Sequence, residues 1–391
     1  MSDQVRIRPR PRGLAVVLIV LIAILLVLVG IYLARRSSPV QQVTPHPTSS
    51  NTVSDPFVSF AQRWTFSNPY TGMDDNVESH WLVGFTQSGK EIEIYDAGEQ
   101  DSRYLDYLVS GENIYILQCD DGGYSQVISI NYANESGEFV DVVRATFDRC
   151  IDQFTVMNDH LFYVNNDPYS DIWSNELIDM DLATGQTSPP FIIDFSQAMD
   201  DFAPGIDFLY TTRDSLFYSL NDETIRLLDL STGQGTLLCE RCAIHYALGE
   251  AILYAQEDED LTNNITFYRY DPATGQSQIL AQEVILFRSM VGSYIIPTGQ
   301  GYVYTDQRND YEFIYTDEHG EATVLKKFSE GYYEVVVPVS ADRIMVCGYS
   351  GDLDEDSLIH HQRILDLQGN LLEGSDSQET YDDIRLPRYG S

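Results

Sequence analysis

Three six-residue stretches of the chain are nearly identical, and they decide its fold: Asp181-Leu-Ala-Thr-Gly185-Gln, Asp229-Leu-Ser-Thr-Gly233-Gln and Asp271-Pro-Ala-Thr-Gly275-Gln. Each lies between two short apolar-rich segments, so each predicts a hairpin with a four-residue loop. The Asp side chain accepts hydrogen bonds from backbone amides inside such a turn. The Gly supplies the left-handed backbone conformation that closes the turn.

Four weaker copies extend the series to both sides. They are Thr86-Gln-Ser-Gly89, Asn134-Glu-Ser-Gly137, Asp317-Glu-His-Gly320 and Asp366-Leu-Gln-Gly369. The seven turn glycines are separated by 42 to 49 residues. A repeat of this length with about four short strands is typical of one β-propeller blade.

A second recurring strand precedes each turn and is rich in aromatic residues, as in Asp159-HLFYV and Asp214-SLFYS. A further apolar strand comes before it in most copies, and no convincing helix intervenes. The sequence therefore predicts an all-β propeller of seven blades over residues 57–391. Six blades with an N-terminal cap is the alternative, because residues 57–80 are irregular. The ring has to close, and the tail Tyr381–Ser391 either supplies a closing strand or is loose.

One transmembrane α-helix is expected before the propeller. Residues 14–34 contain an uncharged run of 20 residues, LAVVLIVLIAILLVLVGIYL, which is long enough to cross a bilayer. It exceeds the apolar region of a cleaved signal peptide, so we expect a single-pass signal anchor. Four arginines precede the run and two follow it, which predicts a cytoplasmic N-terminus, residues 1–13. Residues 35–56 are a flexible Pro/Ser/Thr linker, and residues 57–391 are the extracytoplasmic body in the cell envelope.

The charge balance limits the classes of partner. The chain has 60 Asp and Glu against 23 Lys and Arg, a formal net charge of −37. This excludes a nucleic-acid partner, because phosphate binding requires a cationic surface. It predicts instead a cationic or calcium-bridged partner whose binding weakens as salt rises.

The D-x-x-T-G turns and the Asp/Glu-x-aromatic strands resemble those of bacterial envelope β-propellers of unknown function. These in turn resemble the low-density-lipoprotein-receptor-related and TolB-like propellers. The resemblance covers roughly residues 57–375 and implies a propeller fold, with little indication of activity. The turns also resemble quinoprotein repeats, but no Trp follows Gly185, Gly233 or Gly275, so no quinone cofactor is expected.

Two short motifs are candidates for a site. Asp352, Asp354 and Asp356 alternate as in a calcium loop, although Ser357 stands where Gly normally makes the sharp turn. Cys239 and Cys242 form a lone CxxC at the end of a blade strand, where a local disulfide or two plain thiols are expected rather than a redox or zinc site. Calcium is the only candidate cofactor.

We expect a non-enzymatic role, in which the body acts as a binding or scaffold module for a protein, peptide or glycan. The loops of the blades place variable side chains on a rigid scaffold, an arrangement that favours binding. The alternative is an enzyme that processes envelope polysaccharide or peptide at the mouth of the propeller channel. No nucleophile elbow, HExxH motif or phosphate-binding loop supports it, and the sequence assigns no catalytic residue.

Overall fold

The chain divides into two units, Met1–His46 and Pro47–Ser391, and every described residue belongs to the second. The computed structural model describes residues 55–66, 77–96, 104–119, 124–133, 139–149, 151, 153–164, 174–195, 205–220, 223–248, 250–257, 264–285, 295–298, 300–306, 312–317, 319–327, 332–350, 359–377, 381–385 and 388–390. The predicted membrane helix, residues 14–34, lies outside these ranges. Within them, no helix has the length and hydropathy needed to cross a bilayer.

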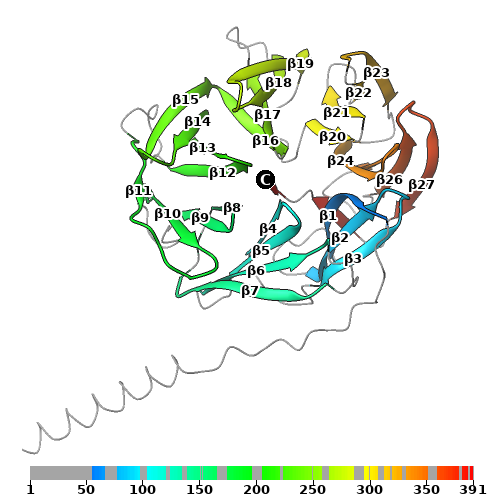
Figure 1. Ribbon diagram of the computed structural model, residues 1–391. Helices are drawn as coiled ribbons and strands as arrows, with labels where there is room; N and C mark the ends of the chain where they lie inside the picture. Colours follow the sequence, from blue (N-terminus) through cyan, green and yellow to red (C-terminus); the bar gives the residue numbers. More distant parts are fainter. Residues whose placement is uncertain are drawn as a thin grey trace, which may run out of the picture. The chain divides into compact units, whose positions relative to one another are not determined.

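The described strands form seven β-sheets arranged in a ring, which confirms the seven-bladed propeller (Figure 1). Blade 1 contains β1 (Phe57–Phe66), β2 (Val77–Thr86), β3 (Glu91–Asp96) and, from the far end of the chain, β28 (Tyr381–Arg385). Blade 2 contains β4 (Tyr104–Ser110), β5 (Asn113–Cys119), β6 (Ser125–Asn131), β7 (Asp141–Phe147) and the short β29 (Arg388–Gly390). Blade 3 contains β8 (Phe154–Met157), β9 (His160–Val164), β10 (Glu176–Asp181) and β11 (Phe191–Ile192).

The other four blades have the same plan. Blade 4 contains β12 (Ile206–Thr212), β13 (Ser215–Leu220), β14 (Thr224–Asp229) and β15 (Gln234–Glu240). Blade 5 contains β16 (Cys242–Leu248), β17 (Ala251–Glu257), β18 (Asn264–Asp271) and β19 (Gln276–Ile285). Blade 6 contains β20 (Ile295–Thr298), β21 (Gly301–Asp306), β22 (Glu312–Asp317) and β23 (Ala322–Lys327). Blade 7 contains β24 (Tyr332–Ser340), β25 (Arg343–Ser350), β26 (Ile359–Asp366) and β27 (Leu371–Ser377).

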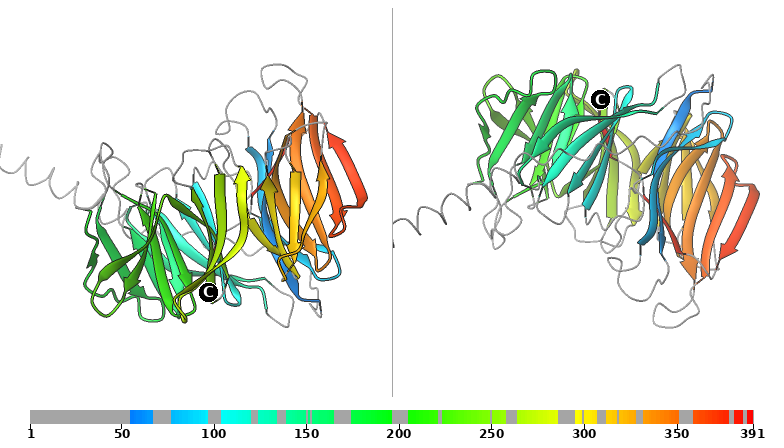
Figure 2. Two further views of the ribbon diagram at one scale, coloured as in Figure 1. Left: turned by 90° about the horizontal axis from the view of Figure 1, so that it is seen from above. Right: turned by 90° about the horizontal axis from the view of Figure 1, so that it is seen from below.

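In blades 2 to 7 the strands follow one another from the axis of the ring to its rim. In blades 3 to 7 the first strand lies nearest the axis and the fourth lies at the periphery, and in blade 2 the short β29 lies on the axis side of β4 (Figure 1). The predicted aromatic-rich segments are the second strands, and they are almost wholly buried, as in β9 and β13. Seen from the side, the strands run between the two ends of the ring (Figure 2).

Strand β28 closes the ring. It pairs antiparallel with β1, with Tyr381 opposite Phe66 and Arg385 opposite Gln62. Blade 1 is thus built from both ends of the propeller sequence. Of the two outcomes expected for the tail, the structure shows the closing strand.

Seven clusters of buried apolar residues lie within the described part of the chain, and each joins two neighbouring blades. Between blades 1 and 2, for example, Phe60 and Leu82 pack with Tyr107. Between blades 7 and 1, Val83 and Phe85 pack with residues of β24 and β25. One sheet cannot bury both of its faces alone, so each blade depends on its neighbours for its core.

Removal of a side chain from one of these interfaces should destabilise the whole ring. Phe217 has no exposed surface and lies between blades 4 and 5. We expect Phe217→Ala to lower the free energy of unfolding by about 3–5 kcal/mol, because the cavity cannot close in a rigid interface. Denaturant unfolding of residues 47–391 measures this change. Leu237→Ala on the outer strand β15, where the side chain is 42% exposed, is the control and should cost under about 0.5 kcal/mol. Equal losses in the two variants would contradict the assignment of the core.

Candidate functional site

The two ends of the ring carry different kinds of connection. Because neighbouring strands within a blade are antiparallel, the first-to-second and third-to-fourth connections of each blade lie at one end, which we call the turn face. It comprises residues 87–90, 111–112, 132–140, 158–159, 182–190, 213–214, 230–233, 249–250, 272–275, 299–300, 318–321, 341–342 and 367–370. The remaining connections belong to the opposite end, the loop face. These connections are identified by the strands they join, and most of their residues lie outside the described ranges: 67–76, 97–103, 120–124, 148–153, 165–175, 193–205, 221–223, 241, 258–263, 286–294, 307–311, 328–331, 351–358 and 378–380.

The connections that join strand ends at the loop face are rich in acidic residues. They contain 25 Asp and Glu residues against five Arg, a net charge of −20. The turn-face connections contain nine Asp and Glu residues against Lys90 and Arg213, a net charge of −7. The acidity that the composition shows for the whole chain is therefore distributed unequally between the two sets of connections.

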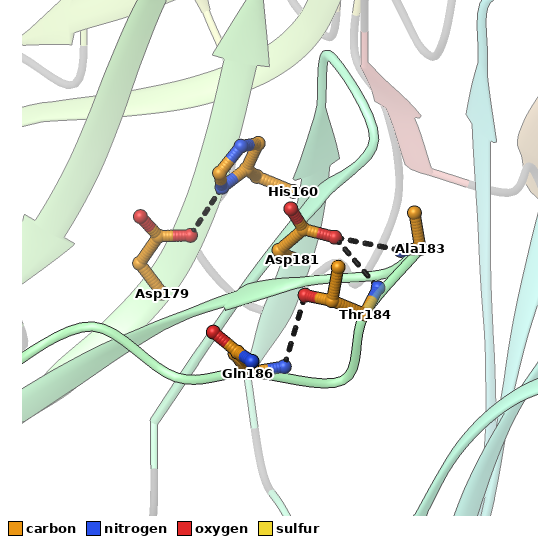
Figure 3. Close-up of polar contacts among 6 residues, drawn as sticks. All are labelled: His160, Asp179, Asp181, Ala183, Thr184 and Gln186. Carbon is orange, nitrogen blue, oxygen red and sulfur yellow. Dashed lines mark hydrogen bonds and ion pairs between the residues drawn. The ribbon is translucent and has the colours of Figure 1, made fainter.

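The turn face contains the Asp-containing turns predicted from the sequence. In blade 3, Asp181 Oδ1 accepts hydrogen bonds from the backbone amides of Ala183 and Thr184, each at 2.8 Å (Figure 3). The amide of Gly185 donates to the carbonyl oxygen of Asp181 at 2.8 Å, and its φ of 68° is the left-handed conformation expected there. The loop is thus held by its own first residue.

The other turns repeat this arrangement. Asp229 Oδ1 accepts from the amide of Ser231 at 2.8 Å, and Asp271 Oδ1 accepts from that of Ala273 at 2.9 Å. The carboxylates of Asp317 and Asp366 each accept from two backbone amides of their turns. Six of the seven predicted turn glycines have positive φ values between 67° and 86°, and the seventh, Gly137, lies outside the described residues.

These hydrogen bonds stabilise the ionised form of the turn carboxylates. The Ser231 hydroxyl and then the Thr232 hydroxyl lower the pKa of Asp229 to about 2. The pKa of Asp181 is lowered chiefly by the amide of Thr184, and that of Asp366 chiefly by the side chain of Asn370. The shifts follow from local turn geometry, so they mark structural carboxylates and indicate no catalytic acid.

His160 forms a polar contact beside the turn of blade 3. Its Nδ1 lies 2.7 Å from Oδ1 of Asp179, on the adjacent strand β10 (Figure 3). The charge of His160 also contributes to the lowered pKa of Asp181. Two carboxylates beside one imidazole do not complete a metal site, and within the described residues no group of three or more His, Cys, Asp or Glu is arranged to hold a metal ion.

Near the axis, hydroxyl groups connect the first strands of successive blades. The Ser110 hydroxyl of blade 2 and the Thr211 hydroxyl of blade 4 both donate to the carbonyl oxygen of Val156 in blade 3, at 3.3 and 3.0 Å. Thr155 and Thr211 also lie within hydrogen-bond distance, at 3.1 Å. These buried contacts fix three blades relative to one another around the axis. Pairing across blades has no short-range sequence signal, so the sequence did not indicate them.

One Ser–His contact lies at the loop-face end of blade 7. Ser350 Oγ on β25 is 2.7 Å from Nε2 of His361 on β26, and the histidine is only 5% exposed. Arg363 lies 3.4 Å from the other ring nitrogen, Nδ1. In a catalytic triad the second ring nitrogen of the histidine faces a carboxylate, which orients the ring. Here the group beside Nδ1 is the guanidinium of Arg363 in place of a carboxylate. The pair is a buried polar contact without the features of an activated nucleophile.

The predicted site residues have different outcomes. Asp352, Asp354 and Asp356 lie outside the described residues, and the calcium loop stays a prediction. Cys239 and Cys242 are joined as a disulfide, with their Cα atoms 6.0 Å apart. Both lie in the apolar cluster between blades 4 and 5, at the step from one blade to the next. This buried position is typical of a local structural disulfide, because a redox centre requires an accessible thiolate.

The Asp turns predict a pH dependence of stability. Because the pKa of Asp229 is about 2 in the folded protein and 3.8 in the unfolded chain, the stabilisation is complete above pH 4 and is lost as the pH falls toward 2. Asp229→Asn should remove this component. Urea unfolding of both proteins at pH 5 and pH 2.5 measures it, and Ser231→Ala should remove part of it. An unchanged pH dependence in Asp229→Asn would refute the assignment.

Calcium binding by the acidic loop predicts a ligand-dependent stability. Millimolar calcium should stabilise residues 47–391 by about 1–2 kcal/mol if the affinity resembles that of extracellular calcium modules. Differential scanning calorimetry with calcium and, as a control, magnesium detects the rise in Tm. The triple variant Asp352→Asn, Asp354→Asn, Asp356→Asn should lose the response. A Tm that does not change with calcium would eliminate the site.

No family model and no curated protein match this sequence. Solved structures are similar in fold. The β-propeller domain of the Trilobed protease from Pyrococcus furiosus is 12% identical and matches 84% of this chain and 94% of its own, with a TM-score of 0.47. A prolyl endopeptidase is 10% identical over 68% of this chain, with a TM-score of 0.47, and the tricorn protease is 12% identical over 81%, with a TM-score of 0.31. The matched parts span only 42% and 30% of those two longer chains.

Proposed function

We propose that this protein is a membrane-anchored binding module whose propeller presents the loop face to a cationic protein or peptide. The observation that carries the proposal is the unequal charge of the two sets of connections, −20 for those that join strand ends at the loop face and −7 for those that join strand ends at the turn face. A charge distribution of this kind attracts an oppositely charged partner to one end of the molecule.

The construction of the ring supports the same assignment. The turn face consists mostly of short connections, several of them held by an Asp side chain. The loop-face connections extend to 13 residues, as in 193–205. Binding residues are found preferentially on loops that a rigid scaffold positions. The buried second strands and the interfaces between blades supply that scaffold.

The proposal places the propeller outside the cytoplasm, as in the envelope propellers of the TolB-like type that the sequence resembles. Residues 14–34 anchor the chain in the membrane and residues 35–56 separate the propeller from the bilayer. An acidic body is repelled by the anionic inner leaflet, which favours the outer side. Within the described residues the alternative, an envelope-processing enzyme, lacks comparable support, since the Ser350–His361 pair has Arg363 where a catalytic triad has a carboxylate.

The charge of the loop face should determine binding of a cationic probe. A fluorescent decalysine peptide should bind residues 47–391 with an affinity that falls at least about tenfold between 50 and 500 mM NaCl, because salt screens exposed charges. Fluorescence anisotropy measures the affinity. Neutralising three loop-face acids should weaken binding more than neutralising three turn-face acids. The matched variants are Asp258→Asn, Glu259→Gln, Asp260→Asn and Glu135→Gln, Glu138→Gln, Glu318→Gln.

The physiological partner is then sought by capture from native membranes with residues 47–391 as bait. A saturable cationic protein whose capture is lost in the loop-face variant supports the proposal. Equal weakening by the two matched variants would show that the probe responds to total charge only, and the loop face would lose its assigned role. Recovery of a neutral glycan would likewise overturn the proposed partner class.

A further inference from the structure

The last strand of the chain lies at the axis of the ring. Strand β29 pairs with β4, the first strand of blade 2, with Arg388 opposite Leu108 and Gly390 opposite Ser110. It also contacts the first strands of the next three blades, β8, β12 and β16. The end of the chain is accordingly at the centre of the ring when the propeller is viewed along its axis (Figure 1).

This strand is not part of the blade repeat. Among the described strands, the sheet of blade 2 alone has five members, and the β4–β29 pair alone is parallel. In blades 3 to 7 the first strand ends the sheet at the axis. The inner edge of a first strand carries backbone N–H and C=O groups that can pair with another chain. Strand β29 uses this edge of β4 in the way that an added peptide strand does.

The charge of the added segment is opposite in sign to that of the rest of the propeller. From Arg385, the last residue of β28, the sequence reads RLPRYGS, with two arginines and no acid in a chain with a net charge of −37, and Arg388 is the arginine that lies in β29. Pro387 lies between β28 and β29, so the segment leaves the closing strand before it pairs with β4. A short strand that contains Arg388 and no acid therefore lies at the axis of a ring formed by a strongly acidic chain.

The parallel direction of the β4–β29 pairing determines from which end of the ring a paired segment enters. Strand β4 runs from the loop face at Tyr104 to the turn face at Ser110, and β29 runs parallel to it. Any segment that pairs with β4 in this way has its preceding residues toward the loop face. A partner held at the acidic loop face is thus on the correct side to insert an extended segment along the axis.

We propose that the inner edge of β4 at Leu108–Ser110 is a binding site for an extended basic peptide segment of a partner, and that β29 is the resident occupant which that segment displaces. The proposal rests on the proposed function, because the loop face brings the partner to the axis. The tail is joined to β28 by only two residues, so its effective concentration at the site is high. The intact chain should therefore bind a free peptide weakly, and removal of the tail should expose the site.

Peptide binding tests this directly. The probe is fluorescein-labelled RLPRYGS, and the proteins are residues 47–391 and 47–385, both of which retain β28 and all seven interfaces between blades. We expect the shorter protein to bind the probe and the longer one to bind it at least tenfold more weakly. A peptide with Tyr389→Pro and Gly390→Pro keeps the charge but lacks two backbone donors, and it should bind the shorter protein at least tenfold more weakly. Equal affinity of the two proteins, or of the two peptides, would overturn the proposal.

Hydrogen exchange supplies a readout that does not depend on affinity. Amides of segment 106–111 should exchange at least tenfold faster in residues 47–385 than in 47–391, and addition of the peptide should restore their protection. Amides of β5, which pair on the other side of β4, should be unchanged and so report that the fold is intact. For a full-length control, Tyr389→Pro with Gly390→Pro in residues 47–391 should reproduce the faster exchange. Unchanged exchange of segment 106–111 in both variants would refute the pairing.

The two proposals fail separately. If the matched loop-face and turn-face variants bind decalysine alike while residues 47–385 bind RLPRYGS and the tail competes, the loop-face function fails and the peptide site stands. If the loop-face variant alone loses the cationic probe while the tail deletion changes neither peptide binding nor exchange, the function stands and the peptide site is absent.

Discussion

The apolar contact between neighbouring blades is the interaction on which the rest of the structure depends. Each sheet has two faces rich in Val, Ile, Leu, Phe and Tyr, and each described cluster combines residues from two successive blades. A row of seven sheets has six such contacts and two exposed apolar faces, whereas a ring has seven contacts and none. Closure is therefore favoured by the burial of the two end faces, and the repeat explains why the faces match.

Closure also has an entropic cost, which the contact between blades 7 and 1 has to exceed. Joining segments more than 250 residues apart costs on the order of 5 kcal/mol by the logarithmic dependence on loop length. The cluster at that interface contains Val83, Phe85, Val337, Val339 and Met345, all buried. Each contributes on the order of 2 kcal/mol, so the cluster outweighs the cost. The β28–β1 pairing then fixes the register in which the two ends meet.

The sequence predicted those features that local chemistry determines. An Asp that accepts hydrogen bonds within its own turn and a Gly with positive φ recur at nearly regular spacing. The residues themselves therefore predicted the seven blades and the turn between the third and fourth strands of each blade. The contact of Ser350 with His361 and the bonds of Ser110 and Thr211 to Val156 depend on strand register and on packing between blades. The position of β29 was equally unpredictable from local sequence. Nothing near Arg388 in the sequence indicates that it pairs with Leu108, 280 residues earlier.

The shortness of the β4–β29 pairing, three residues, also explains why the site at the axis and the loop face would act together. Backbone hydrogen bonds along β29 are the same for any sequence, so they supply affinity but little selectivity. Selectivity then has to come from charge, and the acidic connections are at the end of the ring from which a segment parallel to β4 enters. A neutral tail would occupy the edge equally well by hydrogen bonding. A basic tail resembles the class of segment that the loop face attracts, and this similarity allows an incoming segment to compete for the same place.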